Sequence, residues 1–283
     1  MMPVLLELPL FGWNLSLPTY GTVLALAFLA ALWAALRQAR RAGVEPNLIS
    51  DLWIISLIAG VVGAKLLLYL LDLDYYLANP RAILTTLRSA GVYYGGLLAA
   101  LGACLWIVRR RGLDAWLIGD VLAPAIILGQ GVGRWGCFAA GCCYGKPTSL
   151  PWAVTFTDPR AHEITGVPLH QALHPVQLYL SAADFAAFGV LLWVAARKRF
   201  NGQVLLLYFI LYAVLRGSLE SLRGDPRGEL LGLSTSQAIS IATGIAALAL
   251  YVLRSRSARG SAGRLSSGPR GGGGRKRREA PAP

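Results

Sequence analysis

Charged residues are scarce in this chain. Only 14% of its 283 residues are Asp, Glu, Lys or Arg, whereas soluble globular proteins carry about 25%. Hydrophobic residues make up 55%, and the mean hydropathy is +0.53. So few charges cannot coat one or two soluble domains, and so apolar a chain is not disordered as a whole. The composition excludes an ordinary cytosolic enzyme and predicts a polytopic membrane protein.

The chain also has few cysteines, and its N-terminus does not have the pattern of a signal peptide. The chain has four cysteines, three of them within residues 137–143, and this pattern does not make a secreted disulfide framework. The N-terminus lacks a basic region and a small-residue cleavage site. We therefore expect no removable signal peptide.

Basic residues outnumber acidic ones, 27 to 14, but many of them lie in the C-terminal tail. From Arg254 onward there are nine basic residues and one acidic residue, a net +8 of the total +13. This Gly-, Ser- and Pro-rich segment cannot bury a core and is expected to be disordered. A basic tail after a hydrophobic segment is typical of a topology anchor or an anionic-lipid contact, so nucleic acid is not expected as a partner. We divide the chain into a membrane domain, 1–253, and a cytoplasmic tail, 254–283.

Seven hydrophobic segments predict an all-α fold of about seven transmembrane helices. The fourth and sixth segments are short, and we expect them to continue into more polar stretches that face protein or water. The segments are approximately 20–36, 48–71, 93–108, 116–129, 175–196, 203–215 and 237–253.

Clusters of basic residues follow the first, third, fifth and seventh segments. The positive-inside rule then places the N-terminus outside and the C-terminus in the cytoplasm. The outward connections are 72–92, 130–174 and 216–236. The clusters are Arg37, Arg40 and Arg41, then Arg109, Arg110 and Arg111, then Arg197, Lys198 and Arg199, and finally the tail.

Three cations, Lys65, Arg134 and Arg216, enter the predicted membrane segments. At about 1.5 Å per helical residue, all three fall in the outer half of the bilayer or at its outer interface. One alternative is that each snorkels separately to the headgroups. Three cations at one depth favour a shared anion site, because isolated intramembrane charges are costly. Glu220 follows Arg216 by four residues and precedes Arg223 by three, so we expect it to hold both arginines in a phosphate clamp.

A glycine-rich stretch, GVGRWGCFAAGCCYGKPT, occupies residues 131–148. Five glycines around one arginine imply tight turns and close backbone approach to a ligand. The spacing GRxGxFxxGxxxG resembles the signature of the prolipoprotein diacylglyceryl transferases, with Arg134 at the phosphate-binding arginine.

The resemblance covers most of the chain up to the tail. Four more motifs carry it: Tyr20-Gly21; Gly63-Ala-Lys65 with Tyr69, where Lys replaces the family's Arg; His174-Pro-x-Gln177-Leu-Tyr179; and Arg216-x-x-x-Glu220-x-x-Arg223.

The resemblance implies a lipid-consuming transferase of the bacterial inner membrane, with its site facing the extracytoplasmic leaflet. Its partners would be phosphatidylglycerol, the lipobox cysteine of a prolipoprotein signal peptide, and membrane lipids. The cysteine thiolate would attack the glycerol carbon that bears the phosphate, form a thioether and expel glycerol phosphate. Neither a cofactor nor a metal is expected.

Residue roles follow from matching the family motifs to this sequence. We expect four catalytic residues: Arg134, Arg216, Tyr94 and Glu220. The substrate-binding residues expected are Tyr20, Lys65, Gly95, Gly96, Gly133, Gly136, Cys137, Gly141, Gly145, His174, Gln177, Tyr179 and Arg223.

Several positions depart from the family pattern. Tyr94 stands where the family has the histidine discussed as a base, so His174 and Glu220 are further candidates for that role. Because of these departures, a second hypothesis is a relative that binds an anionic phospholipid without turnover, or that uses another acceptor. The other departures are Cys137 and Ala140 for asparagines, and Cys142 and Leu180 for glutamates.

The clustered cysteines leave three alternatives open. Cys137, Cys142 and Cys143, with the histidines of the same connection, could bind a metal, although the spacing is not that of paired CxxC motifs. Cys137 could instead form a disulfide with Cys142 or Cys143 on the oxidising face. The third alternative is that they are small packing residues, as we expect for Cys104.

Overall fold

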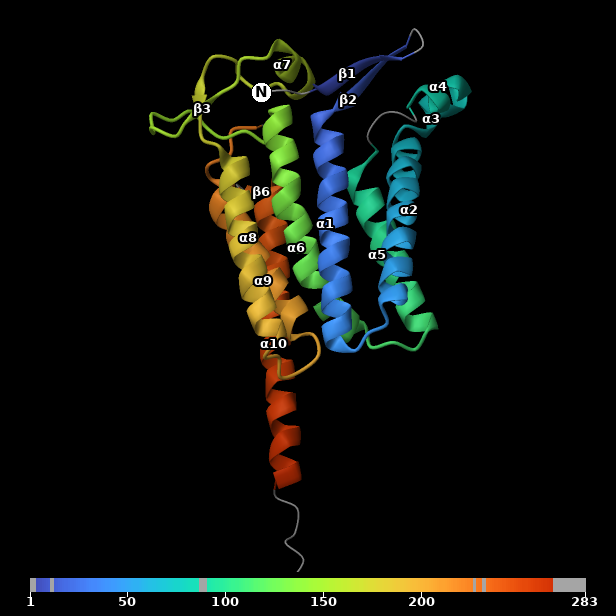
Figure 1. Cartoon of the computed structure of the whole chain (residues 1–283), viewed down its shortest axis with the longest axis vertical. Coiled ribbons are helices and arrows are strands. Elements are labelled where there is room, and N and C mark those ends of the chain that lie inside the picture. The colour runs from blue at the N-terminus through green and yellow to red at the C-terminus, as the bar shows by residue number, and fades with distance from the viewer. Residues whose placement is uncertain (1–3, 11–12, 87–90, 226–227, 231–232, 267–283) are drawn as a thin grey trace, which may run out of the picture.

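The computed structural model describes residues 4–10, 13–86, 91–225, 228–230 and 233–266. In these ranges seven long helices stand side by side, and short elements gather at one end of the bundle (Figure 1). The long helices are α1 (Thr19–Ala42), α2 (Pro46–Leu71), α5 (Tyr93–Arg110), α6 (Ala115–Ala140), α8 (Val176–Ala195), α9 (Gln203–Glu220) and α10 (Thr235–Ser266). The short helices are α3 (Leu73–Ala78), α4 (Pro80–Thr85) and α7 (Pro159–Thr165).

Three small antiparallel hairpins, which the all-α prediction does not include, lie outside the long helices in the described part of the chain. The first precedes α1. The second lies between α6 and α8, in a connection that is outside the long apolar segments. The pairs are β1 (Val4–Leu10) with β2 (Trp13–Pro18), β3 (Val154–Thr155) with β4 (Ala172–Leu173), and β5 (Glu229–Leu230) with β6 (Leu233–Ser234).

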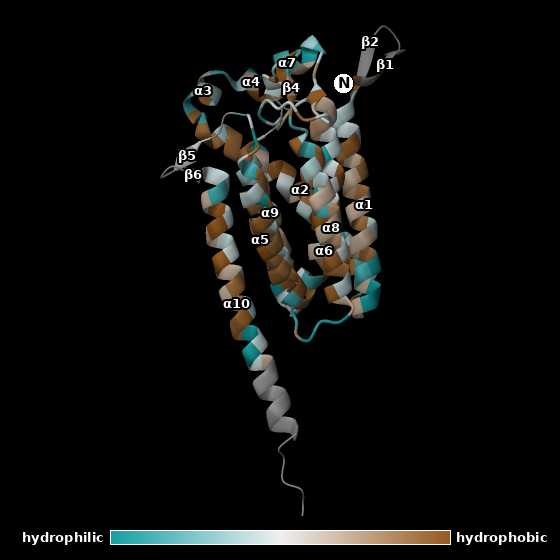
Figure 2. Ribbon diagram, turned by 90° about the vertical axis from the view of Figure 1, so that its left-hand side faces the viewer, coloured by the Kyte–Doolittle hydropathy of each residue, from teal (hydrophilic) through white to brown (hydrophobic). Residues whose placement is uncertain are grey.

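Six described helices, α1, α2, α6, α8, α9 and α10, are long and apolar enough to cross a membrane. The prediction of an all-α polytopic membrane protein is therefore confirmed. Helices α6 and α9 continue to Ala140 and Glu220, beyond their apolar runs, as the sequence predicts. The prediction of a seventh crossing depends on α5, an 18-residue helix that packs along α2. Apolar residues cover the middle of the long helices (Figure 2).

Helix α10 differs from its predicted end. The disordered tail was expected to begin at Arg254, but the helix runs on to Ser266. The Arg254 guanidinium lies 4.1 Å from the ring centroid of Trp116, and this contact ties the helix to the start of α6. The rest of the predicted tail, 267–283, lies outside the described residues.

Arginines stack on tryptophans at one end of the bundle. Three of the pairs are four residues apart on a helix, so both side chains share one face. Amphipathic tryptophans and cationic arginines are typical of a membrane interface, and these pairs lie where the sequence predicts the cytoplasmic side. The pairs are Arg37 with Trp33, Arg110 with Trp106, Arg197 with Trp193, and Arg254 with Trp116.

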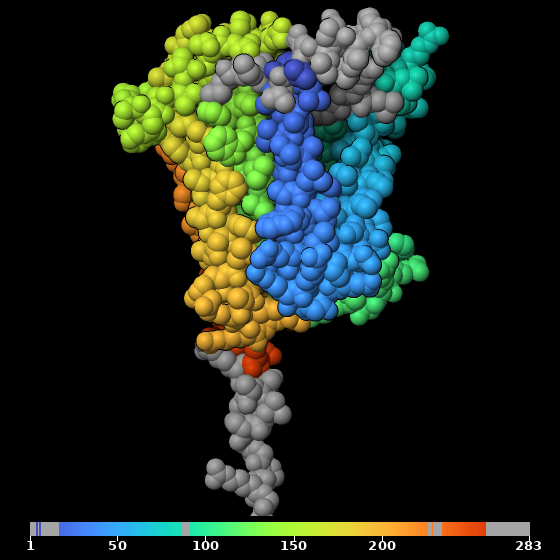
Figure 3. Space-filling view, viewed as in Figure 1, coloured from blue at the N-terminus to red at the C-terminus, as the bar shows by residue number. Residues whose placement is uncertain are grey.

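The buried core lies mainly at this same end. One cluster joins the last turns of α1 and α5 to the first turns of α2 and α6, and its fully buried members include Ala35, Ile49 and Leu52. A second cluster joins α6, α8 and α9 around Ile127 and Leu191. Helix α1 packs against α6 and α2. Figure 3 shows it on the visible face of the molecule, with α6 and α8 on one side and α2 on the other. At the opposite end, the connection after α6 has a buried cluster of its own, which includes Phe156 and Leu173.

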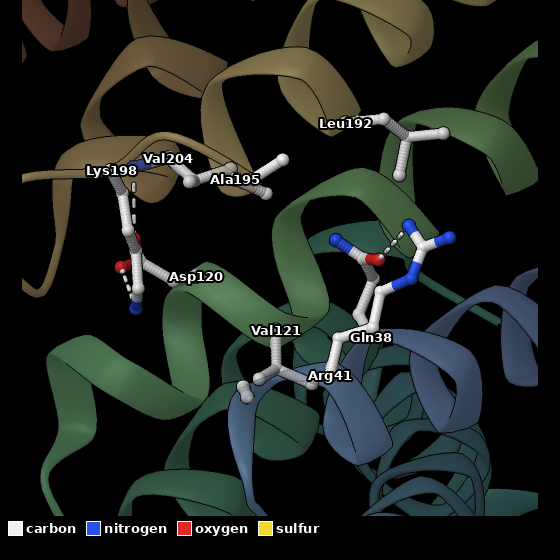
Figure 4. Close-up of a pocket in the computed structure, with 10 residues that line it drawn as sticks. Gln38, Arg41, Asp120, Val121, Leu192, Ala195, Lys198 and Val204 are labelled. Carbon is white, nitrogen blue, oxygen red and sulfur yellow. Dashed lines mark hydrogen bonds and ion pairs between the residues drawn. The ribbon is translucent and has the colours of Figure 1, made fainter.

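A cavity of about 440 Å³ opens at the same end, beside Gln38 and Lys198 (Figure 4). One of its polar lining residues, Asp120, is 3% exposed. Its carboxylate accepts hydrogen bonds from the backbone N–H groups of Gly202, Val204 and Leu205 at 2.9–3.0 Å, and from the Lys198 ammonium at 2.9 Å. Asp120 thus caps the N-terminus of α9 from a neighbouring helix.

Glycines allow α2 and α5 to approach closely. A Cβ at Gly95 would lie 2.5 Å from the carbonyl oxygen of Gly63, and one at Gly96 would lie 2.8 Å from that of Gly60. In lipid, where apolar surface is not driven together by water, helix association relies on such close packing. The glycines of this seam therefore have a packing role.

We expect Gly95→Ala to destabilise the protein by about 1–3 kcal/mol, because the added methyl group must push two backbones apart. Thermal unfolding of the detergent-solubilised protein measures the effect. Gly102→Ala is the matched control on the same helix, since a Cβ at Gly102 meets nothing within 4 Å. Equal stability of the two variants would contradict the packing role.

Candidate active site

Two arginines approach a common acidic residue inside the bundle. Arg134 lies near the end of α6 and Arg216 near the end of α9, and both interact electrostatically with Asp184 of α8. Asp184 is only 4% exposed. The hydroxyl of Tyr93, on α5, is also within electrostatic range of both guanidinium groups. Four helices therefore supply one group of charged and polar side chains, which lies near the end opposite to the Asp120 cavity.

Arg134 differs from Arg216 in its protein partners. In the part of the chain that the structure describes, Arg134 has neither a hydrogen bond nor an ion pair. The residue is half-buried, and Asp184 reaches it through an electrostatic interaction alone, so its hydrogen-bond donors are not used by the described residues. This arrangement suits an anionic ligand.

Arg216 is held by its surroundings. Its Nη2 lies 3.5 Å from Oε2 of Glu220 and donates to the Ser236 hydroxyl at 3.3 Å. Glu220 in turn accepts a hydrogen bond from the Ser234 hydroxyl at 2.9 Å. Arg216 and Glu220 are both buried, so the predicted pair between them is confirmed. The start of α10 thereby fixes the orientation of the Arg216 guanidinium.

Arg223 has a different partner from the one predicted. Its guanidinium binds Asp225 with two hydrogen bonds of 2.9 and 3.0 Å, a bidentate pair. The prediction that Glu220 holds both arginines is therefore wrong for Arg223. The reason is that α9 ends at Glu220, so the helical spacing that would bring Arg223 onto the same face no longer applies.

The signature motif forms the end of α6 and the turn beyond it. Gly141 ends the helix with a φ of 80°, and Cys143 follows with a φ of 60°. These two left-handed residues turn the chain back, and the sulfur atoms of Cys137, Cys142 and Cys143 lie within 4.8 Å of one another. Hydrogen bonds with the Cys137 and Cys142 thiols, together with the charge of Arg223, hold the pKa of Cys143 below its ordinary value. The same thiol contacts raise the pKa of Cys142.

Backbone hydrogen bonds join three separate segments beside this turn. The N–H of Lys146 donates to the carbonyl of Leu222 at 2.9 Å, and the N–H of Gly224 donates to that of Tyr144 at 3.0 Å. The N–H of His174 donates to the carbonyl of Lys146 at 3.0 Å. Gly145 lies at the crossing, where a Cβ would overlap the His174 backbone. Glycine is therefore required here by the close approach of two chains.

The His-Pro-x-Gln-Leu-Tyr stretch supports the same turn. Gln177 is fully buried, and its Nε2 donates to the carbonyl of Cys142 at 2.8 Å. The Tyr179 hydroxyl accepts from the indole of Trp152 at 2.7 Å and lies 3.4 Å from Nδ1 of His174. These residues fix the turn and its neighbouring loop.

Tyr20 and the signature glycines lie between α1 and α6. Tyr20 interacts electrostatically with Arg134 and with the three clustered cysteines. A Cβ at Gly136 would approach the ring and carbonyl of Tyr20 to 3.3–3.4 Å, so this glycine permits close helix packing. A Cβ at Gly133 would meet nothing within 4 Å. The surface at Gly133 is therefore open.

The remaining predicted residues lie on the α2–α5 side. The Lys65 ammonium donates to the backbone carbonyl of Thr86, just after α4. The Tyr94 ring is exposed and packs edge-on against Tyr93, with 5.6 Å between the ring centroids. Gly95 and Gly96 contribute to the seam with α2. Through Tyr93, Tyr94 contacts a residue that is within electrostatic range of both arginines.

Sequence reasoning did not find several partners of the arginines. Tyr93, Asp184, Asp225 and Ser236 have this role, and Ser234 acts indirectly through its hydrogen bond to Glu220. Asp184 carried a usable signal, because an acidic residue inside an apolar segment is rarely there without a partner. The serines carried no such signal, since Ser234 ends β6 and Ser236 lies at the start of α10, 14 and 16 residues beyond Glu220.

Comparison with known proteins agrees with the motifs. Residues 3–253 match the family model described as prolipoprotein diacylglyceryl transferase. A phosphatidylglycerol–prolipoprotein diacylglyceryl transferase of Clostridium tetani is 40% identical, over 86% of this chain and 94% of the relative. The proteins of that name from Finegoldia magna and Thermosynechococcus vestitus are 36% and 30% identical, over 82% and 75% of this chain and 89% and 79% of their own lengths.

The match to the family model runs from the first hairpin through the signature turn to Leu253 in α10, so it includes every residue of the site just described. With two relatives above 35% identity over most of their length, the assignment does not depend on one short motif. The chain belongs to the prolipoprotein diacylglyceryl transferase family, and it is a transferase of the membrane.

Proposed function

We propose that this transferase moves a diacylglyceryl group from phosphatidylglycerol to the lipobox cysteine of prolipoproteins. The thiol loses its proton to a base, and its sulfur attacks the glycerol carbon that bears the phosphate. A carbon–sulfur bond forms as the carbon–oxygen bond breaks, and glycerol phosphate leaves with the bonding electron pair. Negative charge on the leaving phosphate is the main feature that the protein must stabilise.

The convergence of Arg134 and Arg216 carries this proposal. Arg134, whose guanidinium has no hydrogen bond or ion pair among the described residues, would bind the phosphate directly. Arg216, oriented by Glu220, would add a second donor as charge builds on the leaving group. Glu220 acts here as a positioning residue, because its carboxylate is already engaged by Arg216 and Ser234.

We propose the same orientation as the positive-inside pattern predicts. The arginine–tryptophan pairs would then mark the inner-membrane interface on the cytoplasmic side, and the signature turn would face the extracytoplasmic leaflet. This side is the one on which a translocated prolipoprotein presents its cysteine. The tail beyond Arg254 would lie in the cytoplasm.

Turnover of a defined lipid and peptide tests the function. The full chain in detergent micelles is incubated with labelled phosphatidylglycerol and a lipobox peptide, and the thioether product is sought by mass spectrometry. We expect product with phosphatidylglycerol and none with a Cys→Ser peptide. Lipid binding without any thioether would favour instead the hypothesis of a non-catalytic lipid-binding relative.

Tyr94 provides a separate test of how the thiol is deprotonated. An imidazole has an ordinary pKa of about 6.5 and a phenol of about 10, so a histidine accepts a proton more readily near neutral pH. We expect Tyr94→His to keep or raise the turnover rate at pH 7, measured with the peptide assay. Tyr94→Phe is the matched control. If Tyr94→Phe keeps full activity, Tyr94 is not the base, and His174 is then the candidate to substitute.

A further inference from the structure

Three thiol groups lie together at the end of α6. Cys137 belongs to the last turn of the helix, and Cys142 and Cys143 follow directly after it. Their sulfur atoms are within 4.8 Å of one another, and all three side chains are half-buried. Thiolates that share one tetrahedral zinc ion, each with a bond of about 2.3 Å, lie roughly 3.8 Å apart. Only a small side-chain adjustment therefore separates this cluster from a set of metal ligands.

The backbone of the turn brings the three thiols together. Cys143 has a φ of 60°, in the left-handed region that a non-glycine residue adopts only when its surroundings hold it there. The carbonyl of the preceding residue, Cys142, is fixed by the buried amide of Gln177. Residues held in such a conformation by their surroundings are frequently functional. The turn is therefore a preformed cluster of sulfur donors.

The charge around the cluster also suits a metal ion bound by thiolates. A divalent ion with three thiolates carries a net charge of −1, which needs a nearby cation in a half-buried position. Arg223 interacts with Cys143 and is only 5% exposed, and its Nε and Nη2 already pair with Asp225. Its Nη1 is buried without a hydrogen-bond partner among the described residues. A guanidinium with an unpaired buried donor next to a thiol points to a negatively charged ligand group there.

We propose that Cys137, Cys142 and Cys143 bind one thiophilic divalent metal ion of the Zn²⁺ class through their three sulfur atoms. The fourth position would be open to water, and binding would release the thiol protons. The ion would link the last turn of α6 to the loop that pairs with His174 and Leu222. This assignment gives Cys137 a metal rather than the lipid as its ligand.

Cadmium provides the probe, because its thiolate complexes have an ultraviolet charge-transfer band. The full chain is purified in detergent, reduced, freed of reductant under nitrogen and titrated with Cd²⁺. We expect one ion per chain. Cys137→Ser, Cys142→Ser and Cys143→Ser should each weaken binding by about 100-fold or more, because even loss of a second-sphere partner costs about 10–100-fold. Cys104→Ser is the matched control and should bind as the wild type does, since Cys104 lies within α5.

Reduced protein with four titratable thiols that takes up no Cd²⁺ would overturn the proposal, as would a band that survives all three substitutions. A disulfide among the three cysteines in protein purified without reductant, with no metal bound, would also overturn it. If a variant fails to fold, alkylation of the wild type decides: Cd²⁺ should slow labelling of the three cysteines and leave that of Cys104 unchanged. Equal protection of all four cysteines by Cd²⁺ would contradict a metal site at Cys137, Cys142 and Cys143. Because these readouts need no turnover, failure here is distinct from failure of the proposed transfer reaction.

Discussion

Arg134→Ala and Arg216→Ala should each lower the turnover rate by about 10²–10³-fold while the protein still inserts and folds. Each arginine offers a charge-assisted hydrogen bond that strengthens as charge builds on the leaving phosphate, and one such donor is worth about 2.7–4 kcal/mol. Initial rates with labelled phosphatidylglycerol and a lipobox peptide measure the loss. Lysine at either position should restore only part of the rate, because an ammonium keeps the charge but lacks the planar fork.

The matched control is Arg110→Ala, which removes an arginine stacked on Trp106 at the other end of the bundle. It should leave turnover unchanged. Glu220→Gln should give an intermediate loss, because it weakens the orientation of Arg216 without removing a phosphate ligand. If both alanine variants keep full turnover, the phosphate clamp is not the basis of catalysis.

Asp120→Ala should destabilise the protein by about 3–5 kcal/mol, the usual cost of removing one partner from a buried charged network. The substitution leaves three backbone N–H groups at the start of α9 without an acceptor, and it leaves the Lys198 ammonium without its carboxylate. Unfolding of the detergent-solubilised protein, followed by circular dichroism, measures the change. Asp120→Asn should lose less, because the amide oxygen still accepts hydrogen bonds.

Asp51→Ala provides the comparison for Asp120. Asp51 pairs with Arg111 at 3.3 Å, but both side chains are about half exposed. Exposed pairs of this kind contribute about 0–1 kcal/mol. Similar losses in the Asp120 and Asp51 variants would mean that Asp120 is not the cap of α9.

Much of the helical framework was predictable, because long apolar runs and basic clusters report directly on helices in a membrane. The Arg216–Glu220 pair was predictable as well, since four-residue spacing within one helix places both side chains on one face. The partner of Arg223 was not, because the end of α9 depends on contacts that no local spacing reveals. The helical residues after Arg254 were not predicted, because the Gly- and Ser-rich composition indicates disorder and the sequence does not reveal the contact of Arg254 with Trp116.

The centre of the site was predictable only in part. Arg134 follows from the signature motif, but its neighbours Asp184 and Tyr93 come from helices far apart in the sequence. Tyr94 matched a family position, whereas Tyr93 interacts with the arginines, and a one-residue shift on a helix turns a side chain by about 100°. No sequence pattern predicts the backbone pairing of Tyr144–Lys146 with Leu222–Gly224, since peptide groups look alike in every residue.

That backbone pairing also affects the order in which the protein can be made. The signature turn emerges from the ribosome with α6, but its hydrogen-bond partner at Leu222 is synthesised 76 residues after Lys146. At about 5–20 residues per second, this interval lasts roughly 4–15 s. During that time the Lys146 amide lacks this partner, and Arg216 is added only near the end of the interval. Arg216 also waits for Ser236 at the start of α10, so this end of the bundle is completed only after most of the chain has been made.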